Sequence, residues 1–423
     1  MRYASKWLQW SSAELFFIFS VISGVMFGVF SGPIAKSMHL SDTTLGWLSG
    51  IFFIVYAITQ FFSGQLFVIF SARNVLLIST LVSAAGALLF SMTNSIFMLF
   101  VARVMLGVGL AATFVGVLFV AQNSFEARSF PVISSLSQSL ANLCAGIFGF
   151  IAFMLIKGGF RIPYIALSIV FVICALLVLL FFDKNQSNNK SGNKEASFIA
   201  SLKEILKNSQ VWYASLYFSG LFGAVLTFVD LFDVSFQMNA FHESFSNATI
   251  LNSMIPFGLT IGGLILGALA QRLNNYVIPA RFAGLLAIIT FAVILFVRFD
   301  SASANLIVGS TCVLFGIGCS GSILAFQCVQ KNIAEAELRP LATSFVLTFS
   351  YIFSGLIEQP VVGDFIANTE LGVINPGKKM FVYHWIFSST VHDGWYKYNM
   401  GLYFVFATLI ISFIASCFFK QKN

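Results

Sequence analysis

The sequence predicts an all-α integral membrane protein with twelve transmembrane helices in two bundles of six. Of its 423 residues, 58% are hydrophobic and only 9% are charged, which lies far outside the range of soluble domains. The chain contains twelve apolar stretches, and about 20 residues suffice to cross roughly 30 Å of hydrocarbon at 1.5 Å per residue. One clearly polar segment separates the first six stretches from the last six.

The apolar stretches follow one another with short polar turns between them. In the first half we expect helices at about 13–35, 44–70, 75–92, 96–122, 131–156 and 162–182. In the second half we expect them at about 211–236, 248–270, 277–297, 304–329, 341–366 and 399–419. The first stretch is too long for the apolar core of a signal peptide, so we expect it to be retained.

The polar segment between the halves runs from Asp183 to Asn208. Its first part has no apolar period and is typical of a flexible linker. Its end has Leu202, Ile205 and Leu206 at helical spacing with lysines between them, as in a helix on the membrane surface. The predicted organisation is an N-terminal bundle over 1–182, a cytoplasmic linker with an interfacial helix over 183–210, and a C-terminal bundle over 211–423.

The net charge of +7 predicts an orientation in the membrane. Lysine and arginine stand singly between apolar stretches and form no basic stripe, so a nucleic-acid partner is not expected. With both termini in the cytoplasm, most of these residues fall on the cytoplasmic side, where positive charge is retained. We therefore predict a multi-pass protein of the cell inner (plasma) membrane. The six cysteines form no CxxC pair, and neither a metal nor another cofactor is expected.

The two halves share a short pattern at corresponding places. The segment RVMLGVG at 103–109 is echoed by CVLFGIG at 312–318, so that Gly107 and Gly109 align with Gly316 and Gly318. Two related halves around a central cavity are a common design of membrane carriers. The echo therefore predicts pseudo-symmetric bundles in which these glycines serve packing or gating.

Because of the RxxxGxG motif at Arg103, the twelve stretches and the polar central segment, the chain resembles the major facilitator superfamily (MFS) over essentially its full length. The resemblance implies a monomeric secondary transporter with a cavity lined by the first, fourth, seventh and tenth helices. The turn after the second helix departs from the family pattern, since Val68, Ile69 and Ser71 stand where an acid, a base and a glycine are usual. Arg73 remains there, and Arg272 stands in the corresponding turn of the second half; both are candidate gating residues.

Three ionisable residues fall at one predicted depth inside the spans. Arg103, Asp230 and Glu358 each lie about 10 Å below the outer surface at 1.5 Å per residue. We hypothesise that Asp230 or Glu358 exchanges a proton while Arg103 moves between that carboxylate and an anionic group of the substrate; a static ion pair is the alternative. Asp233 is a second-rank candidate because it is expected nearer to water. Glu14 is expected at the membrane interface.

Uncharged polar residues inside the spans are further candidates, because an amide without a partner is unfavourable there. The residues proposed to line the cavity or to join helices are Gln60, Gln138, Asn142, Tyr351 and Gln327.

Three functions remain open from the sequence. The first is proton-coupled uptake of a small polar solute, namely an amino acid, a small peptide or an organic anion. The second is proton-driven export of drugs or metabolites. The fifth helix lacks the glycine-proline signature of family antiporters, which argues against this function. The third is a membrane receptor that does not transport. No enzyme motif stands in a polar setting, so the expected partners are a small-molecule substrate, protons and membrane lipid.

Overall fold

The computed structural model describes residues 2–125, 130–155, 159–182, 202–297, 304–333, 335, 338–370 and 394–421. Within these ranges every regular element is a helix. In the described ranges, eleven helical spans are long and apolar enough to cross a membrane, and Leu136–Ala152 is a shorter apolar stretch within a further helix. The prediction of an all-α protein with membrane-spanning helices is confirmed.

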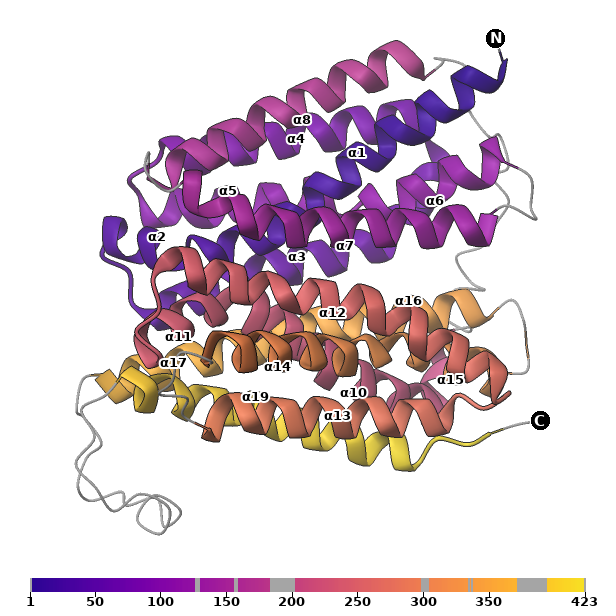
Figure 1. Cartoon of the computed structure of the whole chain (residues 1–423). Coiled ribbons are helices and arrows are strands. Elements are labelled where there is room, and N and C mark those ends of the chain that lie inside the picture. The colour runs from indigo at the N-terminus through magenta and orange to yellow at the C-terminus, as the bar shows by residue number, and fades with distance from the viewer. Residues whose placement is uncertain are drawn as a thin grey trace.

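The N-terminal half forms one bundle, drawn in indigo to magenta in Figure 1. Its first and fourth predicted helices are each interrupted, near Phe30 and at Ala111–Ala112. The elements are α1 (Arg2–Val29), α2 (Ser31–Met38), α3 (Asp42–Ile69), α4 (Ala72–Met92), α5 (Ile96–Leu110), α6 (Thr113–Ser124), α7 (Phe130–Leu155) and α8 (Arg161–Phe181).

The C-terminal half forms the second bundle, and three of its spans change helix type along their length. The elements are α10 (Ser209–Ala224), the π-helix η2 (Val225–Phe232), α11 (Asp233–Ala240), α12 (Phe245–Arg272), α13 (Val277–Phe296), α14 (Ala304–Cys319), the 3₁₀ turn η3 (Ser320–Ile323), α15 (Leu324–Asn332), α16 (Arg339–Phe353), the π-helix η5 (Ser354–Glu358), α17 (Gln359–Glu370) and α19 (Gly394–Cys417). Of the predicted surface helix, residues 202–207 are helical, and the preceding residues 183–201 lie outside the described part.

Serine caps fix where several spans begin. The side chain of Ser41 accepts a hydrogen bond from Thr44 N at the start of α3, and Ser244 accepts one from Asn247 N at the start of α12. Each cap satisfies a backbone N–H that has no partner within its helix. These two helices are the second of their halves, so the same local signal starts both.

The aligned glycines make equivalent contacts in the two bundles. A Cβ at Gly107 would lie 2.9 Å from Phe52 O in α3, and one at Gly316 would lie 2.9 Å from Leu259 N in α12. Gly109 packs in the same way on α4 and Gly318 on α13, where a Cβ would lie 2.9 Å from Ser79 O and 2.6 Å from Ala287 N. The absent side chains allow the backbones to approach closely. The predicted pseudo-symmetry is therefore confirmed, and these glycines pack helices within each half.

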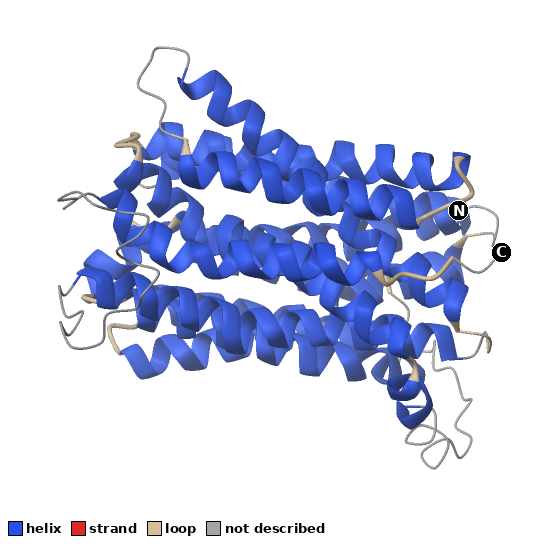
Figure 2. Cartoon of the chain, turned by 90° about the horizontal axis from the view of Figure 1, so that it is seen from below, coloured by secondary structure: helices blue, strands red, loops and turns tan. Residues whose placement is uncertain are grey.

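Both termini lie at one end of the molecule, which we call the terminal side, and the opposite end is the far side (Figures 1 and 2). The two bundles pack tightly against each other on the far side. A Cβ at Gly46 of α3 would lie 2.6 Å from Gln359 O of α17, and one at Gly363 would lie 2.5 Å from Asp42 O. Gly50 and Gly355 face each other in the same seam with no room for a side chain.

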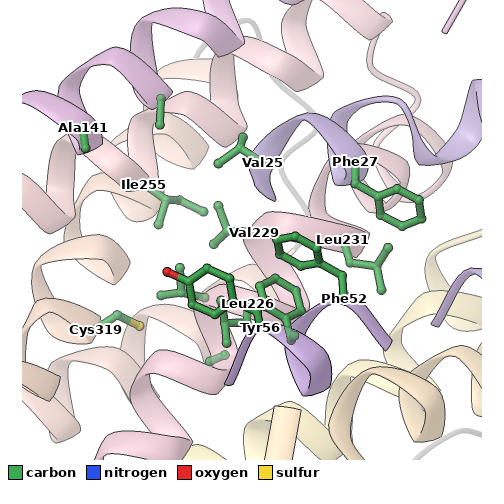
Figure 3. Packing of buried hydrophobic residues seen from close by; sticks show 14 of the residues in the cluster. Val25, Phe27, Phe52, Tyr56, Ala141, Leu226, Val229, Leu231, Ile255 and Cys319 are labelled. Carbon is green, nitrogen blue, oxygen red and sulfur yellow. The ribbon is translucent and has the colours of Figure 1, made fainter. Parts of the chain in front are cut away.

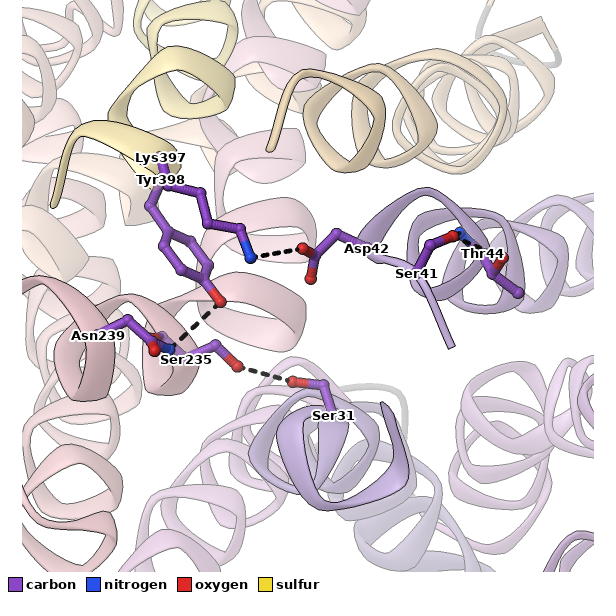
Figure 4. Close-up of polar contacts among 8 residues, drawn as sticks. All are labelled: Ser31, Ser41, Asp42, Thr44, Ser235, Asn239, Lys397 and Tyr398. Carbon is purple, nitrogen blue, oxygen red and sulfur yellow. Dashed lines mark hydrogen bonds and ion pairs between the residues drawn. The ribbon is translucent and has the colours of Figure 1, made fainter. Parts of the chain in front are cut away.

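Polar contacts reinforce the same seam, as Figure 4 shows. Lys397 Nζ lies 3.0 Å from Asp42 Oδ2, which joins the beginning of α19 to the beginning of α3. Ser31 Oγ lies 3.2 Å from Ser235 Oγ, which joins α2 to α11. Ser31 Oγ also donates to Leu231 O at 3.3 Å, and Thr43 Oγ1 to Asp364 Oδ1 at 3.4 Å, so several hydrogen bonds and one ion pair join the bundles on this side. The structure is therefore closed at the far side.

Candidate functional site

Arg103 is enclosed within the N-terminal bundle. The side chain of Arg103, in α5, is 0% exposed. Its Nε donates to Leu48 O at 3.0 Å and its Nη2 to Ser49 O at 3.4 Å, and its guanidinium lies 4.3 Å from the ring centroids of Phe27 and Phe52. Figure 3 shows these two rings in the core. Carbonyl dipoles and aromatic faces thus surround the cation.

The structure does not bring Arg103 to Asp230 or Glu358. No carboxylate in the described ranges forms an ion pair with Arg103, and its Nη1 has no hydrogen-bond partner there. The equal depth predicted from the helical rise fixes a level but not a direction, because the side chain points toward α3 and α1. The three charges therefore do not form one cluster in this conformation.

Glu358 lies inside the C-terminal bundle, where three elements meet. It ends η5 and is 0% exposed. Its Oε2 accepts a hydrogen bond from Thr227 Oγ1 at 2.9 Å, and its Oε1 accepts one from Thr408 Oγ1 at 2.8 Å. A Cβ at Gly223 would lie 2.7 Å from Oε2, so this glycine makes room for the carboxyl group. Glu358 is thus held by hydroxyl groups of η2 and α19, which can bond to either its ionised or its protonated form.

Asp233 is also fully buried, which corrects the expectation that it lies nearer to water than Asp230. Asn252 Nδ2 donates to its Oδ2 at 3.0 Å, and Gln237 Nε2 donates to its Oδ1 at 3.1 Å. Asn252 also donates to Val229 O at 2.9 Å, which ties α12 to η2. The break in α-helical geometry before Asp233 turns it toward α12, a rotation that α-helical spacing could not predict.

Asp230 is the candidate acid that lies between the two bundles. It is partly exposed, whereas Asp233 and Glu358 are buried. Its backbone carbonyl is in contact with Gly28 of α1, and its carboxyl group is close enough to Tyr351 to interact electrostatically. Tyr351 in turn contacts Tyr56 of α3, with ring centroids 5.1 Å apart. This cluster therefore has members from both bundles, namely Asp230, Tyr351 and Tyr56.

Sequence reasoning missed Tyr56 and the hydroxyl groups beside it. Tyr56 is close enough to Thr113 of α6 for a polar interaction, and Thr113 Oγ1 donates to Ser20 Oγ at 3.3 Å. Figure 3 shows Tyr56 among buried side chains of both halves. In the sequence Tyr56 stands among many aromatic residues, and no local signal separates it from residues that fill the core.

Asp230 and Glu358 both occur in π-helical segments, η2 and η5. A π-helix inserts extra residues into a turn and changes the direction of the side chains that follow; such segments occur frequently at functional sites. η2 packs on α1 and η5 packs on α3, so both segments lie against the other bundle. The acids are therefore carried by the irregular parts of the second half.

The remaining predicted residues make no hydrogen bond to this cluster within the described ranges. Gln138 Nε2 donates to Asn142 Oδ1 at 3.2 Å on α7. Gln60 and Gln327 are partly exposed, and their side chains make no hydrogen bond within the described part of the chain. Arg73 Nη2 donates to Leu179 O at 3.3 Å and so joins α4 to α8 within one bundle, while Arg272 is exposed at the end of α12. In the described ranges no group of His, Cys, Asp and Glu could hold a metal ion.

The sequence matches the model of the Major Facilitator Superfamily over residues 15–357. The chain belongs to this superfamily. MFS proteins are transporters. The family therefore indicates that the chain is a multi-pass membrane transporter of this fold rather than an enzyme. No curated protein sequence matches the chain.

Two solved structures share the MFS fold with the chain at low sequence identity. A bacterial homolog of the human lysosomal transporter Spinster, in an inward-facing and unoccupied conformation, aligns with a TM-score of 0.71 and 16% identity over 98% of both chains. The nucleoside transporter NupG aligns with a TM-score of 0.70 and 13% identity over 99% of this chain and 100% of its own. At this identity the likeness establishes the fold and does not identify the substrate.

Proposed function

We propose that this MFS protein is a secondary active transporter that takes up a small polar solute together with protons, across the inner membrane, by alternating access. The observation that carries the proposal is Glu358. It is a fully buried carboxyl group held by two hydroxyl groups, and no cation of the described chain contacts it. A carboxyl group in such a place can bind and release a proton without leaving a buried counter-charge unpaired.

In an alternating-access transporter, the closed far side identifies which side of the membrane the conformation opens to. With both termini in the cytoplasm, as the positive residues favour, the far side faces outward and the conformation is inward-facing. Gly46, Gly50, Gly355 and Gly363 then form the outer seam, whose backbone contacts must separate when the carrier opens outward. The likeness to the inward-facing Spinster homolog agrees with this assignment.

The charges between the bundles favour a solute that is neutral or carries an amine. Arg103 is the single basic residue predicted within a span, and it is enclosed by carbonyl groups and rings. Among the described residues, an organic anion would therefore find no accessible basic group inside the predicted spans, whereas Asp230 is partly exposed. Tyr56 and Tyr351 offer ring faces beside Asp230, which suit an ammonium group or a planar neutral ring. Amino acids and small peptides remain candidates through their amino groups, and neutral nucleosides belong in the same test.

The test is uptake into proteoliposomes of labelled amino acids, dipeptides, nucleosides and organic anions, with and without an inward-acid pH gradient. We expect gradient-driven uptake of a neutral or amine-bearing solute by the wild type. Glu358→Gln should leave exchange of solute intact and abolish the response to the gradient. Glu204→Gln removes the same charge from an exposed site and is the matched control. Equal gradient response in Glu358→Gln and wild type would contradict the coupling role.

A further inference from the structure

Glu14 is a buried acid that the proposed transport cycle does not yet use. It lies on α1, is 3% exposed, and neither of its carboxyl oxygens has a hydrogen-bond partner within the described ranges. The sequence predicts Glu14 at the membrane interface, and the structure adds that it lies about three turns inside α1 and is buried by its neighbours. The carboxyl group is therefore enclosed by protein without a hydrogen bond of standard geometry in the described ranges.

The surroundings of Glu14 contain further polar groups that lack partners. Ser137 of α7 is 0% exposed, and its hydroxyl group lies close enough to the carboxyl group for a polar interaction, although neither group makes a hydrogen bond of standard geometry in the described ranges. One turn earlier on α1, Trp10 Nε1 is likewise buried without a partner. The thiol of Cys144, two turns after Ser137 on α7, is close enough to Glu14 to interact electrostatically. The seam between α1 and α7 thus contains several buried polar atoms that could bind a ligand.

Within the described ranges, the hydroxyl group of Ser137 is the one hydrogen-bond donor found beside the ionised form of Glu14. A buried carboxylate is tolerated where a cation or several hydrogen-bond donors compensate for lost water, and Glu14 has neither. The titratable groups on the elements packed against α1 are Lys36 on α2, Cys144 on α7, Arg161, Tyr164 and Cys174 on α8, Asp230 on η2 and Asp233 on α11, with none on α6. Of these, only the neutral thiol of Cys144 interacts with Glu14. A bound proton removes the charge and supplies a donor.

We propose that Glu14 and Ser137 form a proton-binding site in the N-terminal bundle, separate from Glu358 and occupied in the conformation described here. The bound proton makes Glu14 a neutral acid whose hydroxyl group can bond to Ser137 after a small rotation. Release of the proton needs water or donors at the carboxylate, so it requires the seam between α1 and α7 to open.

The place of α7 connects this site to movement of the bundles. On another face, α7 packs on α12 of the second bundle, where Cβ atoms at Gly146 and Gly149 would meet Phe257 and Ser253. Opening of the α1–α7 seam displaces the helix that forms this contact. That link to transport rests on the proposed function, whereas the binding of a proton at Glu14 does not.

The test is modification of the intact protein by dicyclohexylcarbodiimide, an apolar reagent that adds to protonated carboxyl groups and leaves a stable acylurea. Purified wild-type protein in liposomes is treated at pH values from 6 to 10, and the labelled peptide containing Glu14 is measured by mass spectrometry. We expect labelling at neutral pH that falls about tenfold for each pH unit above its midpoint. Ser137→Ala should move that midpoint, whereas Ser139→Ala on another face of α7 should not.

The outcomes separate this inference from the proposed function. A Glu14 peptide that stays unlabelled at all pH values, while the Glu358 peptide is labelled under the same conditions, would overturn the site. Protection of Glu14 by Na⁺ at constant pH would identify a metal cation as the ligand and would also overturn it. Because labelling is read from wild-type protein without a solute, a failure of uptake in the transport assay leaves this result unchanged.

Discussion

Replacing Gly46 by alanine should drive the two bundles apart on the far side. The added Cβ would lie 2.6 Å from Gln359 O, against the 3.4 Å at which ordinary contact begins, so α3 and α17 must separate locally by about 0.8 Å. The clash is with backbone, which cannot rotate away. Overpacking of this kind costs about 1–3 kcal/mol, and the closed state alone bears that cost. The ratio of open to closed far side should therefore rise about 5- to 150-fold.

Gly24→Ala is the matched control. Gly24 lies in α1, and a Cβ there would have no atom within 4 Å. Both substitutions place alanine in a helix interior, so the gain in helix propensity is the same and the difference isolates the contact. Spin labels at Lys36 and Met238, two exposed positions on α2 and α11, report the separation of the bundles by pulsed electron paramagnetic resonance.

The expected result is a second, longer distance between the labels in Gly46→Ala that is absent from wild type and from Gly24→Ala. Uptake should change with it, because a carrier that favours one state cycles more slowly. If Gly46→Ala gives the wild-type distance distribution while the protein remains folded, the far-side seam does not govern opening and the reasoning from the glycine contacts is refuted.

Three further substitutions test the other parts of the site. Arg103→Lys should lower the free energy of unfolding by about 1–3 kcal/mol, because the variant loses a hydrogen bond and the planar stacking, and it should leave the KM for solute unchanged. Thermal unfolding and uptake kinetics measure the two quantities, and a raised KM at unchanged stability would contradict the prediction. Thr227→Val with Thr408→Val removes two hydroxyl donors to the carboxyl group of Glu358, which favours its protonated form, so the pH midpoint of gradient-driven uptake should rise by about one unit. A fall or no change would count against Glu358 as the proton site. Asp42→Asn removes a partly exposed ion pair worth about 0–1 kcal/mol, so far-side opening should increase less than about fivefold and lose its dependence on salt. The same spin labels measure both effects. If the salt dependence is undiminished, it arises from charges other than this ion pair.

The sequence was sufficient for the fold because the bilayer imposes a simple rule on length and polarity. The apolar stretches, the capping serines at Ser41 and Ser244, and the aligned glycines each act locally, so each could be read without the rest of the chain. Interruptions such as the π-helix η2 were not predictable, because they depend on packing against α1 and α12.

The site was only partly predictable for the same physical reason. Depth along a helix follows from 1.5 Å per residue, so the common level of Arg103, Asp230 and Glu358 could be predicted and stays a prediction. The direction of each side chain depends on neighbours distant in sequence, such as Leu48 for Arg103 and Thr408 for Glu358. Glu14 shows the same limit, since its burial depends on α7 and on how far α1 extends beyond the apolar stretch.

The glycines are arranged alike in the two bundles, whereas the buried acids are not. This difference indicates how protonation shifts the balance between the open and closed far side. Gly107 and Gly316 give both bundles the same internal packing, so neither bundle differs in rigidity on that account. In the second bundle, Asp230 and Glu358 instead lie in η2 and η5, two segments that touch the first bundle. Glu358 directly precedes Gln359, whose carbonyl group contacts Gly46 in the far-side seam. A change in the hydrogen bonds of Glu358 on protonation therefore acts on the same stretch of backbone that closes the far side, so the Gly46→Ala variant should alter the pH dependence of uptake as well as the distance between the bundles.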